Sequence, residues 1–342
     1  MVDEHIESPR PRARRRRARV VALTGVHGVA GSALVRRLEA DERTRRLVLI
    51  DRHAPALPLR DTAFHRVDLT ATLADVALAE VLVRERVDTV IHAAFHDVPH
   101  RNLEAAHELE VLGTRALVRA IADNVRREGS IENVVVLGTT MSYGAWPDNA
   151  QYLDEAAPLR GAAGYAFVAD KVAVEAEVAA LRARTGLAVA MLRLAPIVGD
   201  DRTLLARLLA PAAVPAVLGT DPLVQLLDVD DLVEAARAAA LGRADGAFNV
   251  AGEGVLPLST VIKMSGRLRA AVPESVLRLG LQSMWVLGAG LVPGAHAAYL
   301  RDTFVADTTR IAEELGCPSR YAIRDALARH VSRRRSGLRF AA

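Results

Sequence analysis

The chain has 342 residues, about half of them apolar, which is enough to bury a sizeable core and excludes a mainly disordered protein. The net charge of +3 is concentrated at the start, because residues 1–19 hold seven arginines against three acids. The rest of the chain therefore carries about −1 and is not a basic, nucleic-acid-binding domain. A single cysteine, Cys317, excludes an internal disulfide and is typical of a reducing, cytoplasmic location.

The Arg-rich start of the chain has no apolar periodicity, so we expect residues 1–18 to form a disordered tail. A solvated leader is the simplest interpretation, and loose contact with nucleic acid or anionic lipid is the alternative. No apolar stretch of the kind found in secretory signals follows the arginines.

A glycine-rich stretch follows the tail. An apolar run at residues 20–23 precedes Gly25, Gly28 and Gly31, and apolar residues at helical spacing come next. This order predicts a strand, a tight turn and a helix, the context in which such glycines bind a dinucleotide pyrophosphate. We expect five residues of the turn to contact the cofactor: Gly25, His27, Gly28, Val29 and Gly31.

The next two strands carry acids at their ends. Residues 47–50 are apolar and lead into Asp51, 20 residues after Gly31. A carboxylate there accepts hydrogen bonds from the adenosine ribose and repels a 2′-phosphate, which predicts NAD rather than NADP. The adjacent Arg52 would soften that preference. Asp68 and Leu69 follow a third short strand and are expected to flank the adenine.

Further elements alternate along the chain. A strand at residues 87–94 ends in Ala93 and Ala94, whose small side chains leave room for a flat cofactor. Later predicted elements are a long helix at residues 102–127, a strand at 134–137, a loop over 145–164, a helix at about 165–184 and a strand at 187–194. The strand at 134–137 runs into Thr139 and Tyr143, whose hydroxyls are placed to bind a carbonyl or alcohol oxygen.

Four histidines recur near residue 100, at positions 92, 96, 100 and 107. Four-residue steps can gather metal ligands on one helical face. Pro99 interrupts any helix there, however, and no cysteine or carboxylate cluster joins the histidines, so we expect no metal site.

Alternating strands and helices over about 190 residues predict an α/β fold with a Rossmann-type, doubly wound parallel sheet. We assign residues 19–200 to the dinucleotide-binding domain, with residues 224–252 returning to it. Residues 201–223 and 253–342 are expected to form a smaller C-terminal substrate lobe. Residues 276–300 are unusually apolar, but Arg278, Gln282 and Pro293 argue against a membrane-spanning helix. An apolar pocket or a surface contact, a membrane surface included, is the remaining interpretation.

Together these motifs resemble the extended short-chain dehydrogenase/reductases, the family that includes nucleotide-sugar epimerases and dehydratases. The resemblance spans about residues 19–330 and rests on the glycine-rich turn, Asp51, residues 68–69 and 92–94, Lys171 with Glu175, and residues 193–199. Within the family, the chain is most similar to bacterial proteins described as UDP-glucose 4-epimerase-like that have irregular active sites.

The resemblance implies NAD-dependent redox or epimerase chemistry at a carbinol or carbonyl of a sugar nucleotide or an apolar substrate. It implies that Thr139 and Lys171 act at the reacting centre and that Lys171 and Pro196 also contact NAD. It also implies a homodimer formed by the two long helices.

The predicted active site departs from the family pattern. Members carry Tyr-x-x-x-Lys on one helical face, where the tyrosine exchanges the substrate proton and the lysine lowers its pKa. Four residues before Lys171 lies Phe167, which has no hydroxyl, and the usual asparagine position holds Glu110. Three interpretations stay open. Tyr165 or Tyr143 replaces the missing tyrosine, or the proton comes from Glu110, a histidine or water, or the chain binds dinucleotide without chemistry as a sensor or scaffold.

Overall fold

The computed structural model describes residues 18–56 and 62–340, with side chains up to residue 334. The Arg-rich segment expected to be disordered, residues 1–17, lies outside the described residues.

A seven-stranded sheet forms the centre of the molecule, and all of its strand pairs are parallel. Its strands are β1 (Arg19–Thr24), β2 (Thr44–Asp51), β3 (Thr62–Arg66), β4 (Thr89–His92), β5 (Asn133–Thr139), β6 (Ala188–Leu194) and β11 (Gly246–Val250). They lie in the order β11-β6-β5-β4-β1-β2-β3. The order in which successive strands are added to the sheet therefore reverses between β1 and β4. The predicted Rossmann-type sheet is confirmed, and ligands of such sheets bind at this switch point, outside the carboxyl ends of the strands.

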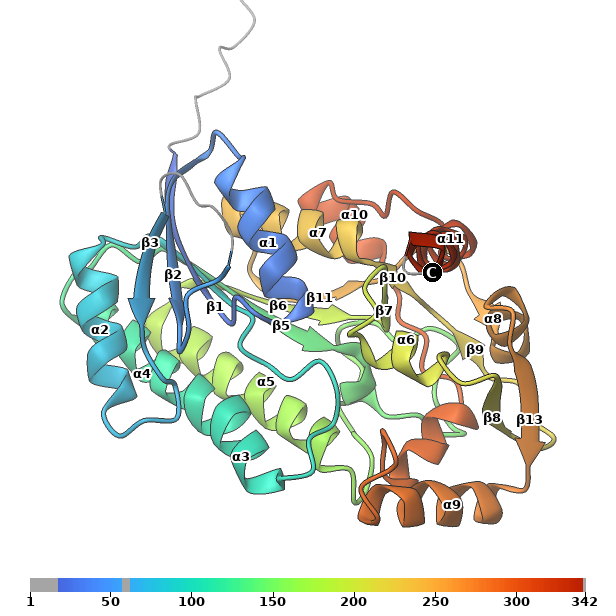
Figure 1. The fold of residues 1–342 in the computed structure, drawn as a ribbon. Coiled ribbons are helices and arrows are strands. Elements are labelled where there is room, and N and C mark those ends of the chain that lie inside the picture. Colours follow the sequence, from blue (N-terminus) through green and yellow to red (C-terminus); the bar gives the residue numbers. More distant parts are fainter. Residues whose placement is uncertain (1–17, 57–61, 341–342) are drawn as a thin grey trace, which may run out of the picture.

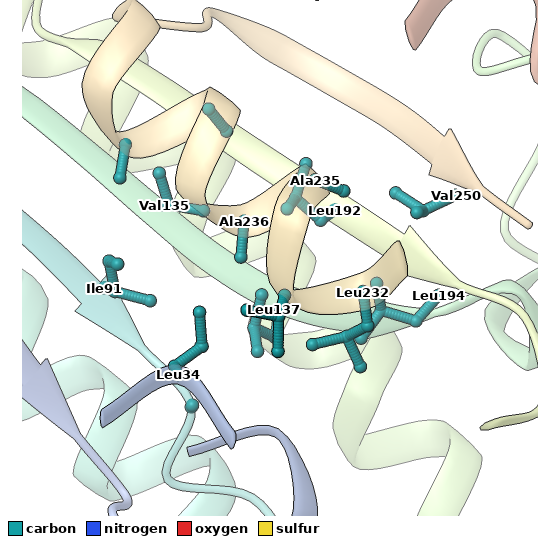
Figure 2. Packing of buried hydrophobic residues seen from close by; sticks show 14 of the residues in the cluster. Leu34, Ile91, Val135, Leu137, Leu192, Leu194, Leu232, Ala235, Ala236 and Val250 are labelled. Carbon is teal, nitrogen blue, oxygen red and sulfur yellow. The ribbon is translucent and has the colours of Figure 1, made fainter. Parts of the chain in front are cut away.

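Helices cover both faces of the sheet (Figure 1). One face carries α1 (Val29–Glu39) and α7 (Val229–Gly242), and the other carries α2 (Ala74–Arg84), α4 (Gly113–Arg126) and α5 (Ala166–Thr185). Figure 2 shows the first of these layers, in which Leu232 and Ala236 of α7 lie over Val135 and Leu137 of β5.

The central strands read as continuous apolar runs because both of their faces are buried. In β1, Val21 and Leu23 join the core under α1 and α7, whereas Val20 and Ala22 join the core under α2 and α4. None of these four side chains is more than 1% exposed. Burial on both sides fixes the sheet and thereby the positions of its carboxyl ends.

The long helix predicted at residues 102–127 forms in three pieces. It begins as α3 (Leu103–His107), capped by Asn102, whose side chain accepts a hydrogen bond from the Ala105 N–H at 3.0 Å. A π-helical turn at Glu108–Leu112 follows, and α4 forms the rest of the predicted helix. Such turns insert an extra residue into a helix and occur frequently at functional sites.

The C-terminal half adds short elements beside the sheet. They are β7 (Ile197–Val198), α6 (Leu204–Leu208), β8 (Ala213–Val217), β9 (Leu223–Val224), β10 (Leu227–Asp228), β12 (Leu256–Pro257), α8 (Leu258–Met264), β13 (Leu268–Val272), α9 (Glu274–Val286), the 3₁₀ segment η3 (Gly294–Leu300), α10 (Thr309–Leu315) and α11 (Ile323–Phe340). Most of their buried side chains form a separate core, but Ile311 of α10 packs into the core of the sheet. The domain boundaries expected from the sequence remain a prediction.

The apolar stretch at residues 276–300 divides into two parts. Helix α9 buries Leu277 but leaves Val276, Leu279 and Val286 exposed along the edge of the molecule (Figure 1). Segment η3 packs against α9 and turns its own side chains inward. In the part of the chain that the structure describes, no helix is both long and apolar enough to cross a membrane.

Replacing Gly31 by alanine should lower the free energy of unfolding by about 2–3 kcal/mol, in the upper range for an overpacked core. A Cβ at this position would lie 1.9 Å from the Gly25 carbonyl oxygen, so the turn and α1 would have to separate. Urea denaturation measures the change. The matched control is Gly280→Ala in α9, where a Cβ meets no atom within 4 Å and alanine should raise stability slightly. Equal effects of the two substitutions would contradict this packing argument.

Candidate active site

The glycine-rich turn between β1 and α1 packs closely against the residues that follow β4. Gly25 has a φ of +75°, and a Cβ there would lie 2.4 Å from backbone atoms of Ala93 and Ala94. Only glycine tolerates both the backbone conformation and this approach. The turn therefore lies directly against the carboxyl end of β4, and the cofactor contacts expected for it remain a prediction.

Asp51, at the end of β2, is held by this turn. One carboxylate oxygen accepts the Val26 N–H at 2.9 Å, and the other accepts the Arg52 N–H at 2.7 Å. Asp68 lies nearby, 4.0 Å from the Arg52 guanidinium, and accepts two hydrogen bonds from Thr70. The structure thus brings together the two acids that the sequence assigns to the adenosine side.

Asp97 occupies the start of α1, and the sequence analysis missed it. Its carboxylate accepts the Val29 N–H at 3.1 Å, so an anion already lies at the positive end of the helix. Burial raises the pKa of Asp97, and this outweighs the opposing effects of the Val29 N–H, Arg202 and Lys171. A carboxylate three residues after Ala94, in the loop that follows β4, was the available signal.

A cavity of about 170 Å³ begins at this point and runs under the C-terminal elements. Its walls include Gly28 and Ala30 at the start of α1, Thr139 at the end of β5, and residues 194–197 at the end of β6. The opposite wall comes from α6, η3 and neighbouring residues. One continuous space therefore connects the glycine-rich turn with the C-terminal lobe.

Thr139 lies on this wall and also caps a 3₁₀ turn, η2 (Thr140–Tyr143). Its Oγ1 accepts the Met141 N–H at 3.2 Å. The hydroxyl hydrogen is left for another partner, since Oγ1 acts only as acceptor in this contact. Thr139 therefore lines the cavity with a hydroxyl whose hydrogen is not used in the contact with Met141.

Lys171, in the second turn of α5, is almost completely buried. Its ammonium lies 2.8 Å from the Glu110 carboxylate, and the two side chains are 6% and 2% exposed. The ammonium also lies over the ring of Phe95, at 4.6 Å, and over that of Phe167, at 5.1 Å. Its charge is therefore paired within the wall of the cavity.

Glu110 reaches this lysine from the π-helical turn. Its Oε1 accepts the His96 N–H at 3.1 Å. Burial alone would raise the pKa of Glu110, but Lys171 and His96 hold that pKa below its ordinary value. Glu110 is therefore ionised at neutral pH and holds no proton to donate.

Phe167 lies one helical turn before Lys171 and forms part of the cavity wall. Its ring has no polar atom, so it exchanges no proton with a ligand. The position next to the lysine ammonium is occupied by an apolar group.

Tyr165 and Tyr143, the two tyrosines considered as replacements, have other partners and do not line the cavity. The Tyr165 hydroxyl lies 3.1 Å from Nδ1 of His296, and its side chain is 1% exposed. The Tyr143 hydroxyl donates to Asn249 at 2.7 Å and accepts from Arg193 at 2.8 Å. The structure places both hydroxyls in buried contacts that stabilise the loops behind the site.

Two further polar side chains of the cavity wall come from η3, which the sequence analysis did not single out. His296 contacts Tyr165 through Nδ1, and Tyr299 donates its hydroxyl proton to the Met141 carbonyl at 2.8 Å. Burial lowers the pKa of His296 to about 4, so the ring is neutral at pH 7. Both lie within an apolar run of the sequence, where an isolated polar residue was the only signal.

Of the four histidines near residue 100, His96 and His100 lie side by side, with ring centroids 5.0 Å apart, whereas His92 and His107 have other partners. His92 bridges Thr24 and Thr114 inside the core, and burial lowers its pKa to about 3. His107 pairs with Asp170 at 2.7 Å. Among the described residues, no group of three histidine, cysteine or acidic side chains could hold a metal ion.

Comparison with known proteins identifies the family. A family model described as the NAD dependent epimerase/dehydratase family matches residues 21–251, more than half of the chain. The chain belongs to this family. Uncharacterized proteins of Mycobacterium tuberculosis (Rv0501) and Mycobacterium bovis (Mb0513) are each 30% identical over 309 residues, covering 87% of this chain and 79% of the relative.

Solved structures of similar fold include nucleotide-sugar enzymes. MoeE5 in complex with UDP-glucuronic acid and NAD has a TM-score of 0.70 and 23% identity, over 93% of this chain and 99% of that one. UDP-glucose 4-epimerase from Thermotoga maritima with UDP-glucose has a TM-score of 0.69 and 16% identity, with the same coverage. At these identities the likeness shows the fold, and the fold agrees with the family assignment.

Proposed function

We propose that the chain is an NAD-dependent oxidoreductase or epimerase-like enzyme that acts at a carbinol or carbonyl group. The observation that carries this proposal is the single cavity that joins the glycine-rich turn, Thr139, Lys171 and the C-terminal lobe. In a parallel α/β sheet, this edge is where cofactor and substrate meet. The description of the family to which the chain belongs names NAD as the cofactor.

The residues around the turn fit NAD. The Val29 N–H already binds a carboxylate, so the start of α1 suits the pyrophosphate. Asp51 at the end of β2 suits the ribose hydroxyls and favours NAD over NADP. When bound, NAD would accept or donate a hydride. Its other contacts would come from Gly25, His27, Gly28, Gly31, Arg52, Asp68, Leu69, Ala93, Ala94, Lys171 and Pro196.

Side chains of the protein would carry out the remaining steps of the reaction. Thr139 would orient the substrate oxygen through its free hydroxyl hydrogen, and Lys171 would hold the nicotinamide ribose. Phe167 and ionised Glu110 supply no proton, and the hydroxyls of Tyr165 and Tyr143 are engaged behind the site. A histidine of the cavity wall or a water molecule is therefore the proton source that this arrangement favours.

A second candidate function is dinucleotide binding without chemistry, as a sensor or scaffold. Two observations favour it: Phe167 beside Lys171, and the pairing of Lys171 with Glu110. Loss of a positioned general acid typically costs 10²- to 10⁴-fold in rate.

Titration of the protein with NADH and NADPH, followed by NADH fluorescence, tests the proposal. We expect saturable binding that favours NADH, and slow oxidation of bound NADH by at least one member of a panel of ketones and UDP-sugars. Binding without oxidation of NADH by any member would support the non-catalytic candidate. If neither dinucleotide binds, both candidate functions are contradicted.

Replacing Asp97 by asparagine should raise NADH affinity about tenfold at pH 8, since a charge repulsion of about 1.4 kcal/mol is removed. The wild-type carboxyl has a raised pKa and takes up a proton as the pH falls. The advantage of the variant should therefore shrink as the pH is lowered. Arg202, Lys171 and Asp200 are the other charged groups that act on this carboxyl, and the substitution changes none of them. An affinity ratio that is independent of pH would contradict this role for Asp97.

The expected homodimer and cytoplasmic location remain part of the proposal. The outer face of α5 exposes Ala176 and Ala180, whose small side chains would allow a second copy of the helix to approach closely. Analytical ultracentrifugation of the full chain measures the oligomeric state directly.

A further inference from the structure

The wall of the cavity contributed by the C-terminal half is almost entirely apolar. Eight of its side chains are hydrocarbon: Ile197, Leu204, Leu205, Leu208, Val224, Leu258, Leu300 and Phe304. On the sheet side, Leu137, Met141 and Leu194 continue the same surface. A ligand in this part of the cavity would exchange water for hydrocarbon over most of its surface.

Most hydrogen-bonding groups of the polar side chains on this wall already bind other groups of the protein. Thr203 caps α6 by accepting the Ala206 N–H at 3.3 Å, and the Tyr299 hydroxyl donates to the Met141 carbonyl. His296 uses Nδ1 for Tyr165, whereas no described residue hydrogen-bonds its Nε2. Nε2 of His296 is therefore the polar atom that this wall can offer to a ligand.

The C-terminal part of the cavity, beyond the start of α1 that would hold the pyrophosphate of NAD, offers no charge among its described lining residues that suits a second diphosphate. Lys171 is the one lysine or arginine among the described lining residues, and it is already paired with Glu110. Asp97 adds a negative charge. Arg202 lies close by but donates its hydrogen bonds to the His27 carbonyl, Ser32 and Asp200 outside the cavity. Burying a phosphate without a free cation or donor costs several kcal/mol.

We propose that the C-terminal part of this cavity binds an uncharged, predominantly hydrocarbon ketone or alcohol rather than a sugar nucleotide, with its oxygen directed to polar groups such as Nε2 of His296. This rests on the proposed function for the cofactor side, and it narrows the substrate class left open there. The ligand class follows from the hydrocarbon wall, from Nε2 of His296 as the polar atom of the C-terminal wall without a described hydrogen-bond partner, and from the absence of an unpaired cation among the described lining residues.

A series of 2-alkanones tests this inference by calorimetry, with and without saturating NADH. Affinity should rise about fourfold for each methylene from 2-pentanone toward 2-nonanone, the equivalent of about 0.8 kcal/mol per CH₂. UDP-glucose should bind at least tenfold more weakly than 2-nonanone. Affinity that is independent of chain length, tighter binding of UDP-glucose, or binding of neither ligand to NADH-loaded protein would each overturn the inference.

Two neighbouring positions of α6 provide matched variants. Leu208 lines the cavity, and Arg207 beside it is exposed. Leu208→Gln should weaken 2-nonanone binding at least fivefold, whereas Arg207→Gln should change it less than twofold. Equal effects would show that the ketone binds elsewhere and would overturn the inference. NADH affinity is measured in the same samples, so a failure of cofactor binding counts against the proposed function and is distinguishable from a failure to bind the ketone.

Discussion

Replacing Lys171 by methionine should lower the free energy of unfolding by about 3–5 kcal/mol at pH 8, because Glu110 then remains buried without a partner. The two side chains lie 2.8 Å apart and are nearly inaccessible to solvent. Urea denaturation of wild type and variant measures the difference. The same variant should lose NADH affinity if Lys171 holds the nicotinamide ribose.

The pH dependence of that loss identifies its cause. In the wild type, the pKa of Glu110 lies below its ordinary value of 4.5, so the stability contributed by the pair is fully present above that pH and is lost as the pH falls further. Without Lys171, burial would raise the pKa of Glu110, and the carboxyl would take up a proton at a higher pH. The destabilisation by Lys171→Met should therefore shrink from pH 8 toward pH 5.

Two controls separate the ion pair from general packing. Lys263→Met changes the exposed lysine on α8 and should leave stability within about 0.5 kcal/mol of wild type. The double variant Glu110→Gln/Lys171→Met removes both charges and should recover most of the loss, since replacing a whole buried pair is often nearly neutral. A double variant as unstable as Lys171→Met alone would contradict the ion-pair explanation.

Replacing Phe167 by tyrosine should increase the rate of ketone reduction by on the order of 10²-fold, because a positioned phenol supplies the missing general acid. The Phe167 ring lies one helical turn before Lys171, with the ammonium 5.1 Å from its centroid. Initial rates of NADH oxidation with 2-nonanone measure the gain. A second change, Glu110→Asn, would free the lysine charge to lower the pKa of the new tyrosine and should raise the rate further.

Phe95→Tyr is the matched control for this substitution. Its ring also flanks the Lys171 ammonium, at 4.6 Å, and it also lines the cavity. A phenol there lies on a different element from the family's tyrosine position and should leave the rate within threefold of wild type. Equal gains from the two variants would show that the rate responds to polarity of the cavity and not to a positioned acid.

The part of the site built from neighbouring residues could be predicted from the sequence. Gly25, Gly28 and Gly31 lie within one turn, and their spacing alone specifies the approach of α1 to β1. The position of Asp51 could be predicted in the same way, because it lies at the end of the next apolar strand. These features depend on local backbone geometry, which the sequence encodes directly.

The contacts that decide the chemistry were harder to predict from the sequence, because they join segments that lie far apart along the chain. Glu110 meets Lys171 from a π-helical turn, which the regular helical period of the sequence does not predict. Tyr143 follows β5 in the sequence, where a catalytic hydroxyl is expected, yet its hydroxyl is hydrogen-bonded to Arg193 and Asn249. His296 comes from η3, whose docking against α9 no local pattern predicts.

The most direct test of the account is transfer of deuterium from NADH labelled at C4 of the nicotinamide to 2-nonanone, followed by mass spectrometry of the product. A slow enzyme with Phe167 beside Lys171 should still deliver deuterium to C2 of 2-nonanol, and it should do so faster after Phe167→Tyr. If NADH binds but neither form transfers deuterium to any alkanone or UDP-sugar, the claim of redox chemistry in this cavity is contradicted and the chain is a dinucleotide-binding protein without that activity.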